Sequence, residues 1–178
     1  MRESIIGLAV FFLATGIASA QSAPQPVCVT DEYRQFDFWV GQWDVYDPRT
    51  NELVAHSLIE KLYDGCAVRE NWLPLKGKGG GSLNSYRADR RQWIQIWTDW
   101  QNAFNEYRGG LENGSMVMTG TSTSAAGKES PARMTFEPQK DGSVIQTGYS
   151  STDSGKTWQL NYQFVYRKSA APQRSSGH

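Results

Sequence analysis

Turn-forming residues recur along the chain at nearly regular intervals, and this spacing constrains the fold more than any other feature. Asp64-Gly65, Asn113-Gly114 and Asp141-Gly142 are pairs that favour tight hairpin turns, because glycine accepts the positive φ that such turns require. Six further clusters of turn residues lie at 47–51, 77–81, 88–90, 99–102, 124–128 and 153–155. Nine breaks predict ten strands of five to ten residues.

Strands joined by tight hairpins are antiparallel neighbours, and a meander of ten strands closes to remove its edges. We therefore expect an all-β protein, an antiparallel up-and-down barrel of about ten strands. Before the first strand, Thr30 can cap a short helical turn in which Tyr33, Phe36 and Trp39 share one face.

The first twenty residues have the layout of a cleavable signal peptide: Arg2, an apolar run from Ile5 to Ile17, and small residues at 18–20. The apolar run is too short to span a membrane as a helix. We expect an exported protein, periplasmic or extracellular. The predicted division is a signal peptide at 1–20, an extended segment at 21–29, one barrel domain at 30–168 and a disordered tail at 169–178.

The chain has two cysteines, Cys28 and Cys66, and export favours a disulfide between them over two buried thiols. Eighteen basic and eighteen acidic residues are scattered along the sequence. Such a balanced charge predicts no nucleic-acid partner and no anionic lipid surface. The oligomeric state is left open.

The hairpin at Asp64-Gly65 predicts a register. A two-residue turn pairs Tyr63 with Cys66 and Glu60 with Arg69, so the latter two charges stabilise one another. Both strand faces then mix polar and apolar residues. A lumen containing water, a ligand or a polar network explains this mixture better than a dry sandwich core does.

Residues 36–45 read FDFWVGQWDV, and this segment resembles the mark of a family of bacterial exported proteins of unknown function. Further residues match the pattern of that family in order along the chain. They are Ile59-Glu60, Asp64 to Ala67, Glu70, Trp72, Ser82, Asn84, Tyr86, Trp93, Gln95, Trp97, Asp99, Met116 to Gly120 and Trp158 to Arg167.

Gly41-x-Trp43 at the first strand, with Arg167 at the last, also resembles the lipocalin and calycin signature. The resemblance implies that the arginine packs over the tryptophan and closes the barrel. It indicates a calycin-like barrel, as in nitrobindins and fatty-acid-binding proteins, without transferring their ligands. No cofactor and no metal are expected, because His56 is the only histidine inside the predicted domain.

The strongest candidate for a binding surface is Trp93-x-Gln95-x-Trp97-x-Asp99, since a period of two places all four side chains on one strand face. Two indoles with an amide and a carboxylate suit a flat polar ligand or a sugar. Alternatively, the tryptophans fill the core while Gln95 and Asp99 satisfy each other or a water.

Glu60 and Glu70 invite a comparison with paired catalytic carboxylates, but the predicted register places them on opposite faces. A salt bridge of Glu60 with Arg69, and burial of Glu70 against Tyr86 or Arg87, is the favoured interpretation. The glycine-rich segment 77–81 lacks the strand and helix of a phosphate loop, and a flexible hairpin connection that gates one barrel mouth is favoured.

Three functions are compatible with these patterns. The first is a non-enzymatic barrel that binds a small, partly apolar molecule in its lumen. The second is an enzyme, a hydrolase or isomerase with Glu60, Glu70 or Asp99 as a base, and the third is a structural or interaction protein of the envelope. We favour the first and assign no catalytic residue. The lumen candidates are Glu70, Trp72, Asn84, Tyr86, Gln95, Trp97 and Asp99.

Overall fold

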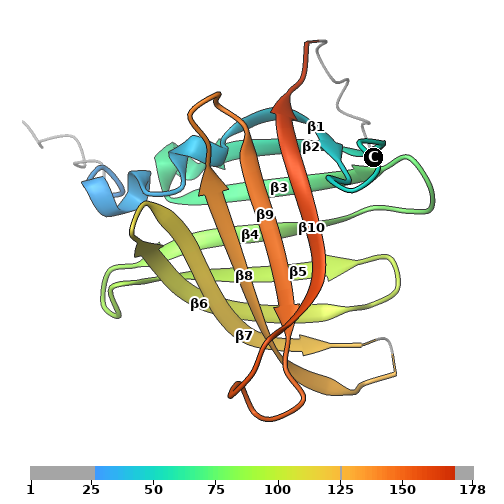
Figure 1. The fold of residues 1–178 in the computed structure, drawn as a ribbon. Coiled ribbons are helices and arrows are strands. Elements are labelled where there is room, and N and C mark those ends of the chain that lie inside the picture. The colour runs from blue at the N-terminus through green and yellow to red at the C-terminus, as the bar shows by residue number, and fades with distance from the viewer. Residues whose placement is uncertain (1–26, 125, 171–178) are drawn as a thin grey trace, which may run out of the picture.

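The computed structural model describes residues 27–124 and 126–170. The expected signal peptide, most of the extended segment and the tail after residue 170 lie outside the described residues. Three short 3₁₀ helices and ten strands make up the fold (Figure 1). In chain order the elements are η1 (Asp31–Arg34), η2 (Asp37–Trp39), β1 (Gly41–Tyr46), β2 (Leu53–Leu62), η3 (Tyr63–Gly65), β3 (Ala67–Pro74), β4 (Gly80–Arg87), β5 (Gln92–Asp99), β6 (Phe104–Glu112), β7 (Ser115–Thr123), β8 (Glu129–Pro138), β9 (Val144–Ser150) and β10 (Gln159–Lys168).

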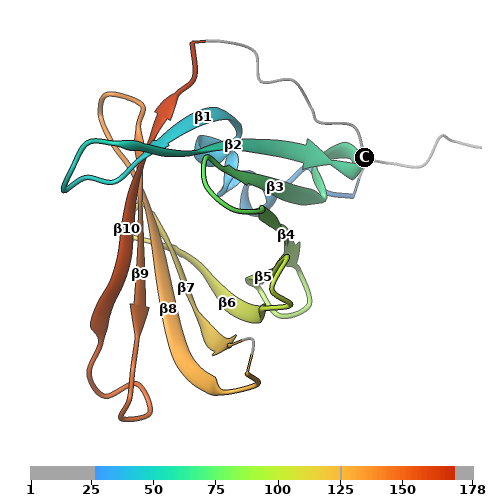
Figure 2. The ribbon, with the colours of Figure 1, turned by 90° about the vertical axis from the view of Figure 1, so that its right-hand side faces the viewer.

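Each strand pairs antiparallel with its successor, and β1 pairs with β10, so the sheet is a closed barrel of ten strands (Figures 1 and 2). The predicted fold class is therefore confirmed. Seven of the nine predicted breaks fall wholly between strands, and the other two, at 77–81 and 99–102, overlap the start of β4 and the end of β5. At the β6–β7 turn, Asn113 and Gly114 have φ of 50° and 85°, the backbone for which this pair is favoured.

The predicted register of the β2–β3 hairpin is confirmed, because Glu60 lies opposite Arg69 and forms an ion pair with it. The turn itself differs from the prediction. Strand pairing stops at Leu62 and Ala67, and Tyr63–Gly65 forms the 3₁₀ helix η3 in place of a two-residue turn. The longer connection adds one residue on each side, so the parity of the strand faces is unchanged.

The N-terminal segment closes one end of the barrel. Thr30 precedes η1 as predicted, although its side chain caps no backbone N–H and instead donates to Glu32. The disulfide between Cys28 and Cys66 is confirmed, and it joins this segment to the β2–β3 connection. The segment therefore lies at the barrel end that contains the β2–β3 turn.

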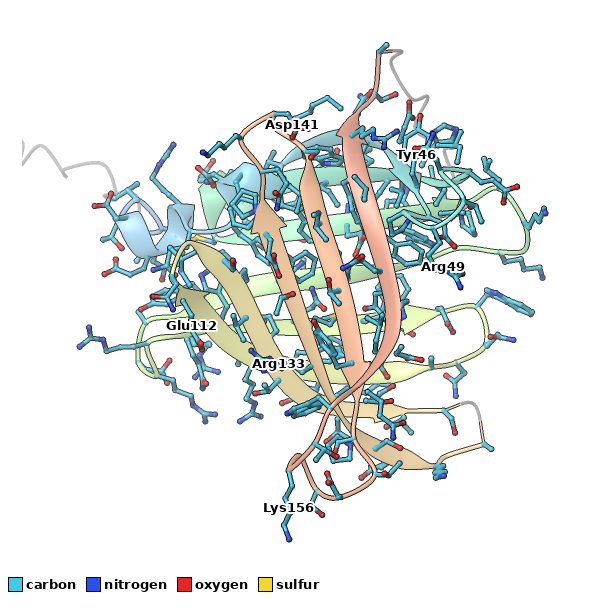
Figure 3. The ribbon with its side chains drawn as sticks, viewed as in Figure 1. Tyr46, Arg49, Glu112, Arg133, Asp141 and Lys156 are labelled. Carbon is cyan, nitrogen blue, oxygen red and sulfur yellow. A yellow bond between two sulfur atoms is a disulfide. The ribbon has the colours of Figure 1, made fainter. Side chains whose placement is uncertain are left out.

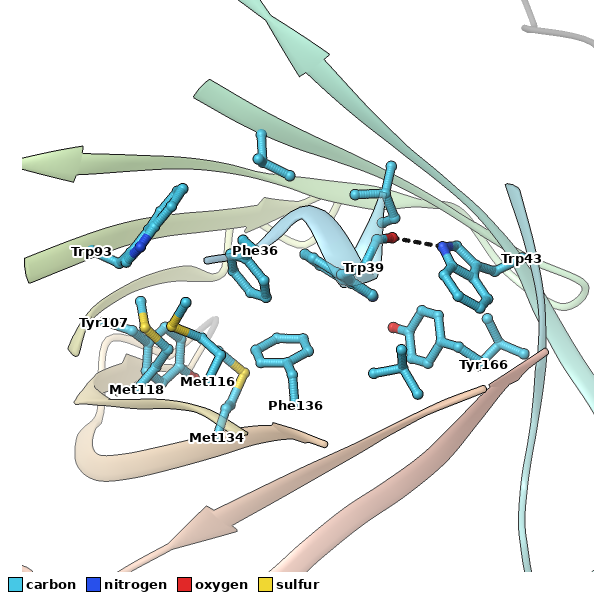
Figure 4. Close-up of a cluster of buried hydrophobic side chains, with 14 of the residues drawn as sticks. Phe36, Trp39, Trp43, Trp93, Tyr107, Met116, Met118, Met134, Phe136 and Tyr166 are labelled. Atoms are coloured by element: carbon cyan, nitrogen blue, oxygen red, sulfur yellow. Dashed lines mark hydrogen bonds between the residues drawn. The ribbon is translucent and has the colours of Figure 1, made fainter. Parts of the chain in front are cut away.

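The aromatic residues of this segment enter the barrel and form its core (Figure 4). Phe36 and Trp39 are fully buried, and their rings stack 5.0 Å apart. Phe36 also meets Trp93 at 5.6 Å and Phe136 at 5.1 Å. Below this plug the methionines of β7 and β8 fill the remaining space: Met116, Met118 and Met134. The plugged end is thus a packed hydrophobic core.

The closure between β1 and β10 differs from the expected one by one residue. Trp43 lies opposite Lys168 in the register, and the Lys168 ammonium lies 3.8 Å from the centroid of the Trp43 ring. Arg167 instead stacks on Tyr46 at 4.5 Å. Because successive strand residues point to opposite faces, the predicted arginine is on the wrong side of β10 to reach Trp43.

Gly41 has the role of permitting a close approach. Its φ is +145°, and a Cβ built there would lie 2.5 Å from Lys168 Nζ. The same ammonium donates to the backbone oxygen of Val40 at 2.9 Å. Glycine at position 41 therefore leaves room for the lysine that covers Trp43.

Candidate functional site

The barrel encloses a cavity of about 480 Å³ on the side of the core away from the N-terminal plug. Hairpin connections alternate between the two ends, so the β5–β6, β7–β8 and β9–β10 connections lie at the end opposite the plug (Figures 1 and 2). The lining reaches Ser124 and Lys128 in the β7–β8 connection. The main inward-facing lining residues are Glu70, Trp72, Gln95, Trp97, Asn105, Tyr107, Ser122, Ser130, Met134, Gln146, Ser150, Tyr162, Phe164 and Tyr166.

One wall of the cavity is a row of aromatic rings. Tyr162 stacks on Phe164 at 5.2 Å with 29° between the rings, and Phe164 lies 5.3 Å from Trp72. Gly148 on β9 makes room for this row, since a Cβ there would lie 2.2 Å from the Tyr162 ring. Trp97 and Tyr107 contribute further aromatic surface from β5 and β6. Such a surface suits a flat, partly apolar molecule.

The floor of the cavity is polar and centres on Glu70, which is only 4% exposed. Its Oε1 lies 3.2 Å from Ser57 Oγ and 3.3 Å from the Tyr166 hydroxyl. Its Oε2 lies 3.3 Å from Ser82 Oγ. These neighbours come from β2, β10 and β4, so the carboxyl group joins three strands across the lumen. No Lys or Arg is paired with Glu70 among the described ion pairs.

The network continues from Glu70 along β4 and β5. Asn84 donates to Ser82 Oγ at 3.1 Å and to the backbone oxygen of Val68 at 2.9 Å. Gln95 Nε2 then donates to Asn84 Oδ1 at 2.7 Å. This amide pair satisfies the buried Asn84 and fixes the orientation of Gln95 at the cavity surface.

Tyr166 links the carboxyl group of Glu70 to an amide on β9. Its hydroxyl is 2.7 Å from Gln146 Oε1 and 3.3 Å from Glu70 Oε1, and it has one proton to donate. The proton can be directed to either acceptor, so the two contacts share one donor.

Burial has the largest effect on the pKa of Glu70. Desolvation raises the pKa of Glu70 to about 7, against the smaller lowering effect of its contacts with Ser57, Ser82 and Tyr166. Burial also raises the pKa of Tyr107 to about 12 and the pKa of Tyr162 and Tyr166 still further. Glu70 is therefore the floor group that titrates near neutral pH.

Four of the seven lumen candidates line the cavity: Glu70, Trp72, Gln95 and Trp97. Asn84 is fully buried on the inner face of β4, outside the cavity lining, and accepts from Gln95 Nε2. Tyr86 packs edge-on against Tyr33 of η1, outside the cavity lining. Asp99 accepts from the backbone N–H groups of Gln101 and Ala103 and organises the β5–β6 turn. Tyr86 and Asp99 are therefore not part of the cavity site.

The alternating surface on β5 is thus divided between two environments. Trp93 is fully buried beside Phe36 and belongs to the core, in agreement with the alternative that the tryptophans of this motif fill the core. Gln95 and Trp97 face the cavity. The expected contact between Gln95 and Asp99 does not form, because Asn84 is the partner of Gln95.

The two glutamates lie on opposite faces of the barrel wall. Glu60 pairs with Arg69 on the outside, while Glu70 points inward. The expected burial of Glu70 against Tyr86 or Arg87 is wrong: Arg87 pairs with Asp89 at the surface. Glu70 instead contacts Ser82, its register partner on β4, Ser57 on β2 and Tyr166 across the lumen on β10.

Several residues of the site were not selected from the sequence. They are Ser57, Tyr107, Gln146, Tyr162, Phe164 and Tyr166. Segment 161–166 reads NYQFVY, and its aromatic residues at every second position are a signal for one face of a strand. Gln146 and Ser57 had no comparable signal, because a lone amide or hydroxyl in a strand is common on either face.

Within the described residues, no group of three or more His, Cys, Asp and Glu side chains is placed to hold a metal ion. His56 is on the outer face and contacts Asp44 through Nδ1 at 2.8 Å.

None of the described helices has the length and apolar character required to cross a membrane. No family model and no curated protein matches the chain.

Proposed function

We propose that this protein is an exported barrel that binds one small, partly apolar molecule in its lumen. The observation that carries the proposal is the cavity of about 480 Å³, which has a row of aromatic rings along one wall and a hydrogen-bonded polar floor. Ligand sites have this size and this mixture of apolar lining with a few oriented polar groups. Export and membership of the FDFWxGxW family are part of the same proposal and rest on the sequence.

Tryptophan fluorescence tests the binding function, because Trp72 and Trp97 line the cavity. A small-molecule library screened against the protein from residue 21 onward should produce a saturable change for compounds of one shape class. We expect Trp97→Phe to lose much of this change. Trp100→Phe is the matched control, since Trp100 is 55% exposed outside the lumen and should respond as the parent does.

Native mass spectrometry of protein purified from its source provides a second readout. A bound mass that is absent after denaturation would support the proposal. The proposal would be wrong if no compound changed the fluorescence, no bound mass appeared and the protein still unfolded cooperatively, since the cavity would then exist without a ligand.

One observation favours a second candidate function, an enzyme that uses Glu70 for proton transfer. A carboxyl group whose pKa is about 7 and which faces a cavity suits a general acid or base at neutral pH. Glu60 pairs with Arg69 outside the barrel and Asp99 organises a turn, so Glu70 is the remaining candidate of the three. A ligand recovered from the protein in deuterated water would carry deuterium if Glu70 abstracts a proton, and Glu70→Gln would prevent its incorporation.

A further inference from the structure

The cavity floor holds one acidic group among hydroxyl and amide neighbours. The Tyr166 hydroxyl lies 3.3 Å from Glu70 Oε1 and 2.7 Å from Gln146 Oε1. The hydroxyls of Ser57 and Ser82 lie 3.2 Å and 3.3 Å from the two carboxyl oxygens. These contacts hold the carboxyl group in place and bring no positive charge to it.

The side chains packed around Glu70 supply no positive charge. Ser57 faces it from β2, Ser82 from β4, and Tyr162 and Tyr166 from β10. Gln146 on β9 completes the surroundings through Tyr166. The tyrosines have pKa values raised by burial, so these groups remain uncharged while Glu70 titrates.

Among the residues that the structure describes, two basic ones, Lys128 and Arg133, touch the cavity, and neither lies at its floor. Lys128 belongs to the β7–β8 connection at the open end. Arg133 lies on β8 (Figure 3) between Ala132 and Met134, whose side chains are buried. Alternation along the strand therefore directs the Arg133 side chain to the outer face. A carboxylate bound deep in the cavity would therefore find no counter-charge at the floor.

The polar atoms that remain at the cavity surface suit an uncharged ligand. Gln95 uses its Nε2 for Asn84, which leaves Oε1 as an acceptor for a ligand N–H or O–H group. The hydroxyl of Tyr107 lines the same cavity and has no hydrogen bond to another described residue, so it can donate. Together with the flat wall of Tyr162, Phe164 and Trp72, these groups match a planar molecule with a neutral polar substituent.

We propose that the lumen selects uncharged planar molecules and excludes carboxylates, because the described residues of its floor include a carboxyl group and no cation. This inference rests on the proposed function and names its ligand class. It also separates this barrel from one that would bind fatty acids as anions.

Two probes with the same ring system test the selectivity: 2-naphthamide, which is neutral, and 2-naphthoate, which is ionised throughout the range from pH 6 to 8.5. We expect naphthamide to bind at least about tenfold more tightly than naphthoate at pH 6, measured by tryptophan fluorescence. Equal binding, or tighter binding of naphthoate, would overturn the selectivity and leave the binding function supported. Binding of neither probe would contradict both proposals.

Glu70→Gln identifies the residue responsible, because the amide keeps the size of the side chain and cannot ionise. At pH 8.5 we expect this variant to bind naphthoate at least about tenfold more tightly than the parent does. Glu106→Gln is the matched control, since Glu106 pairs with Arg108 on the barrel surface and its replacement should leave that affinity unchanged.

The parent protein decides the question if Glu70→Gln does not fold. Naphthoate keeps its charge between pH 6 and 8.5, while Glu70 loses its proton over that range. Naphthoate affinity should therefore fall by about tenfold as pH rises. An affinity independent of pH would overturn the role assigned to Glu70.

Discussion

The ammonium group of Lys168 covers the Trp43 ring at 3.8 Å and is bonded to the backbone oxygen of Val40 at 2.9 Å. It therefore links β10 to β1 at the seam where the barrel closes, and it also binds the residue that follows the N-terminal plug. Burial against the ring lowers the pKa of Lys168, because the charged form loses part of its hydration. The seam thus depends on a cation that is partly removed from water.

Replacement of this lysine tests its contribution to closure. We expect Lys168→Met to reduce the free energy of unfolding by about 1 to 2 kcal/mol, through loss of the cation–π contact and of the bond to Val40. Arg167→Met should cost about 0.5 kcal/mol, since Arg167 is exposed and stacks on Tyr46 at the surface. Urea unfolding measures both. A larger loss in Arg167→Met would return the closing role to the arginine.

The stability of the protein should depend on pH through Glu70. Its pKa in the folded state, about 7, lies above its ordinary value of 4.5, so the folded state retains a proton that the unfolded state has lost. Stability therefore falls as pH rises from about 4.5 to about 7, and the loss is on the order of 3 kcal/mol. Glu70→Gln should lack this loss and gain relative to the parent between pH 5 and pH 8. A constant difference between the two proteins across that range would contradict the raised pKa.

The disulfide should contribute through the loop that it closes. Cys28 and Cys66 are 38 residues apart, and a loop of this length corresponds to about 4 kcal/mol in the chain-entropy estimate. We expect the parent to lose stability of this order when a reductant is added. The double variant Cys28→Ala, Cys66→Ala should begin at the lower stability and be insensitive to the reductant, as thermal unfolding would report.

The plug residue Phe36 should be among the most costly to truncate. Its ring contacts Trp39, Trp93 and Phe136 and is fully buried. Phe36→Ala should lower the free energy of unfolding by about 3 to 5 kcal/mol. Phe104→Ala is the matched control, since Phe104 is 54% exposed and should cost less than about 1 kcal/mol. Similar costs for the two would show that the plug packs loosely in solution.

Local chemistry was sufficient to predict the strands and their order. Asn113-Gly114 and the other turn clusters separated ten strands correctly, because positive φ and turn hydrogen bonds depend on residues adjacent in the sequence. The pairing of Glu60 with Arg69 followed from the parity of one hairpin. The position of the closing cation was wrong by one residue, since the β1–β10 register depends on closure of the whole sheet.

The candidate site was predicted in part. Glu70, Trp72, Gln95 and Trp97 line the cavity, and alternation along single strands had placed them on candidate faces. Tyr86 and Asp99 share those alternations but lie near strand ends, where the plug and a turn occupy them. The alternation along one strand predicts which face a side chain occupies. It does not predict how close that side chain lies to the end of the barrel, which depends on the tertiary structure.

The sequence by itself determined the all-β class, the ten-strand meander and the disulfide pairing, because these depend on turn residues, strand periodicity and the presence of two cysteines. Only the tertiary structure decided that the N-terminal aromatic residues plug one end and that Glu70 meets Tyr166 from a strand 96 residues away. Such contacts depend on the closure and tilt of the barrel, which bring side chains together across the lumen without any local signature. The buried, hydrogen-bonded carboxyl floor is a consequence of those long-range contacts.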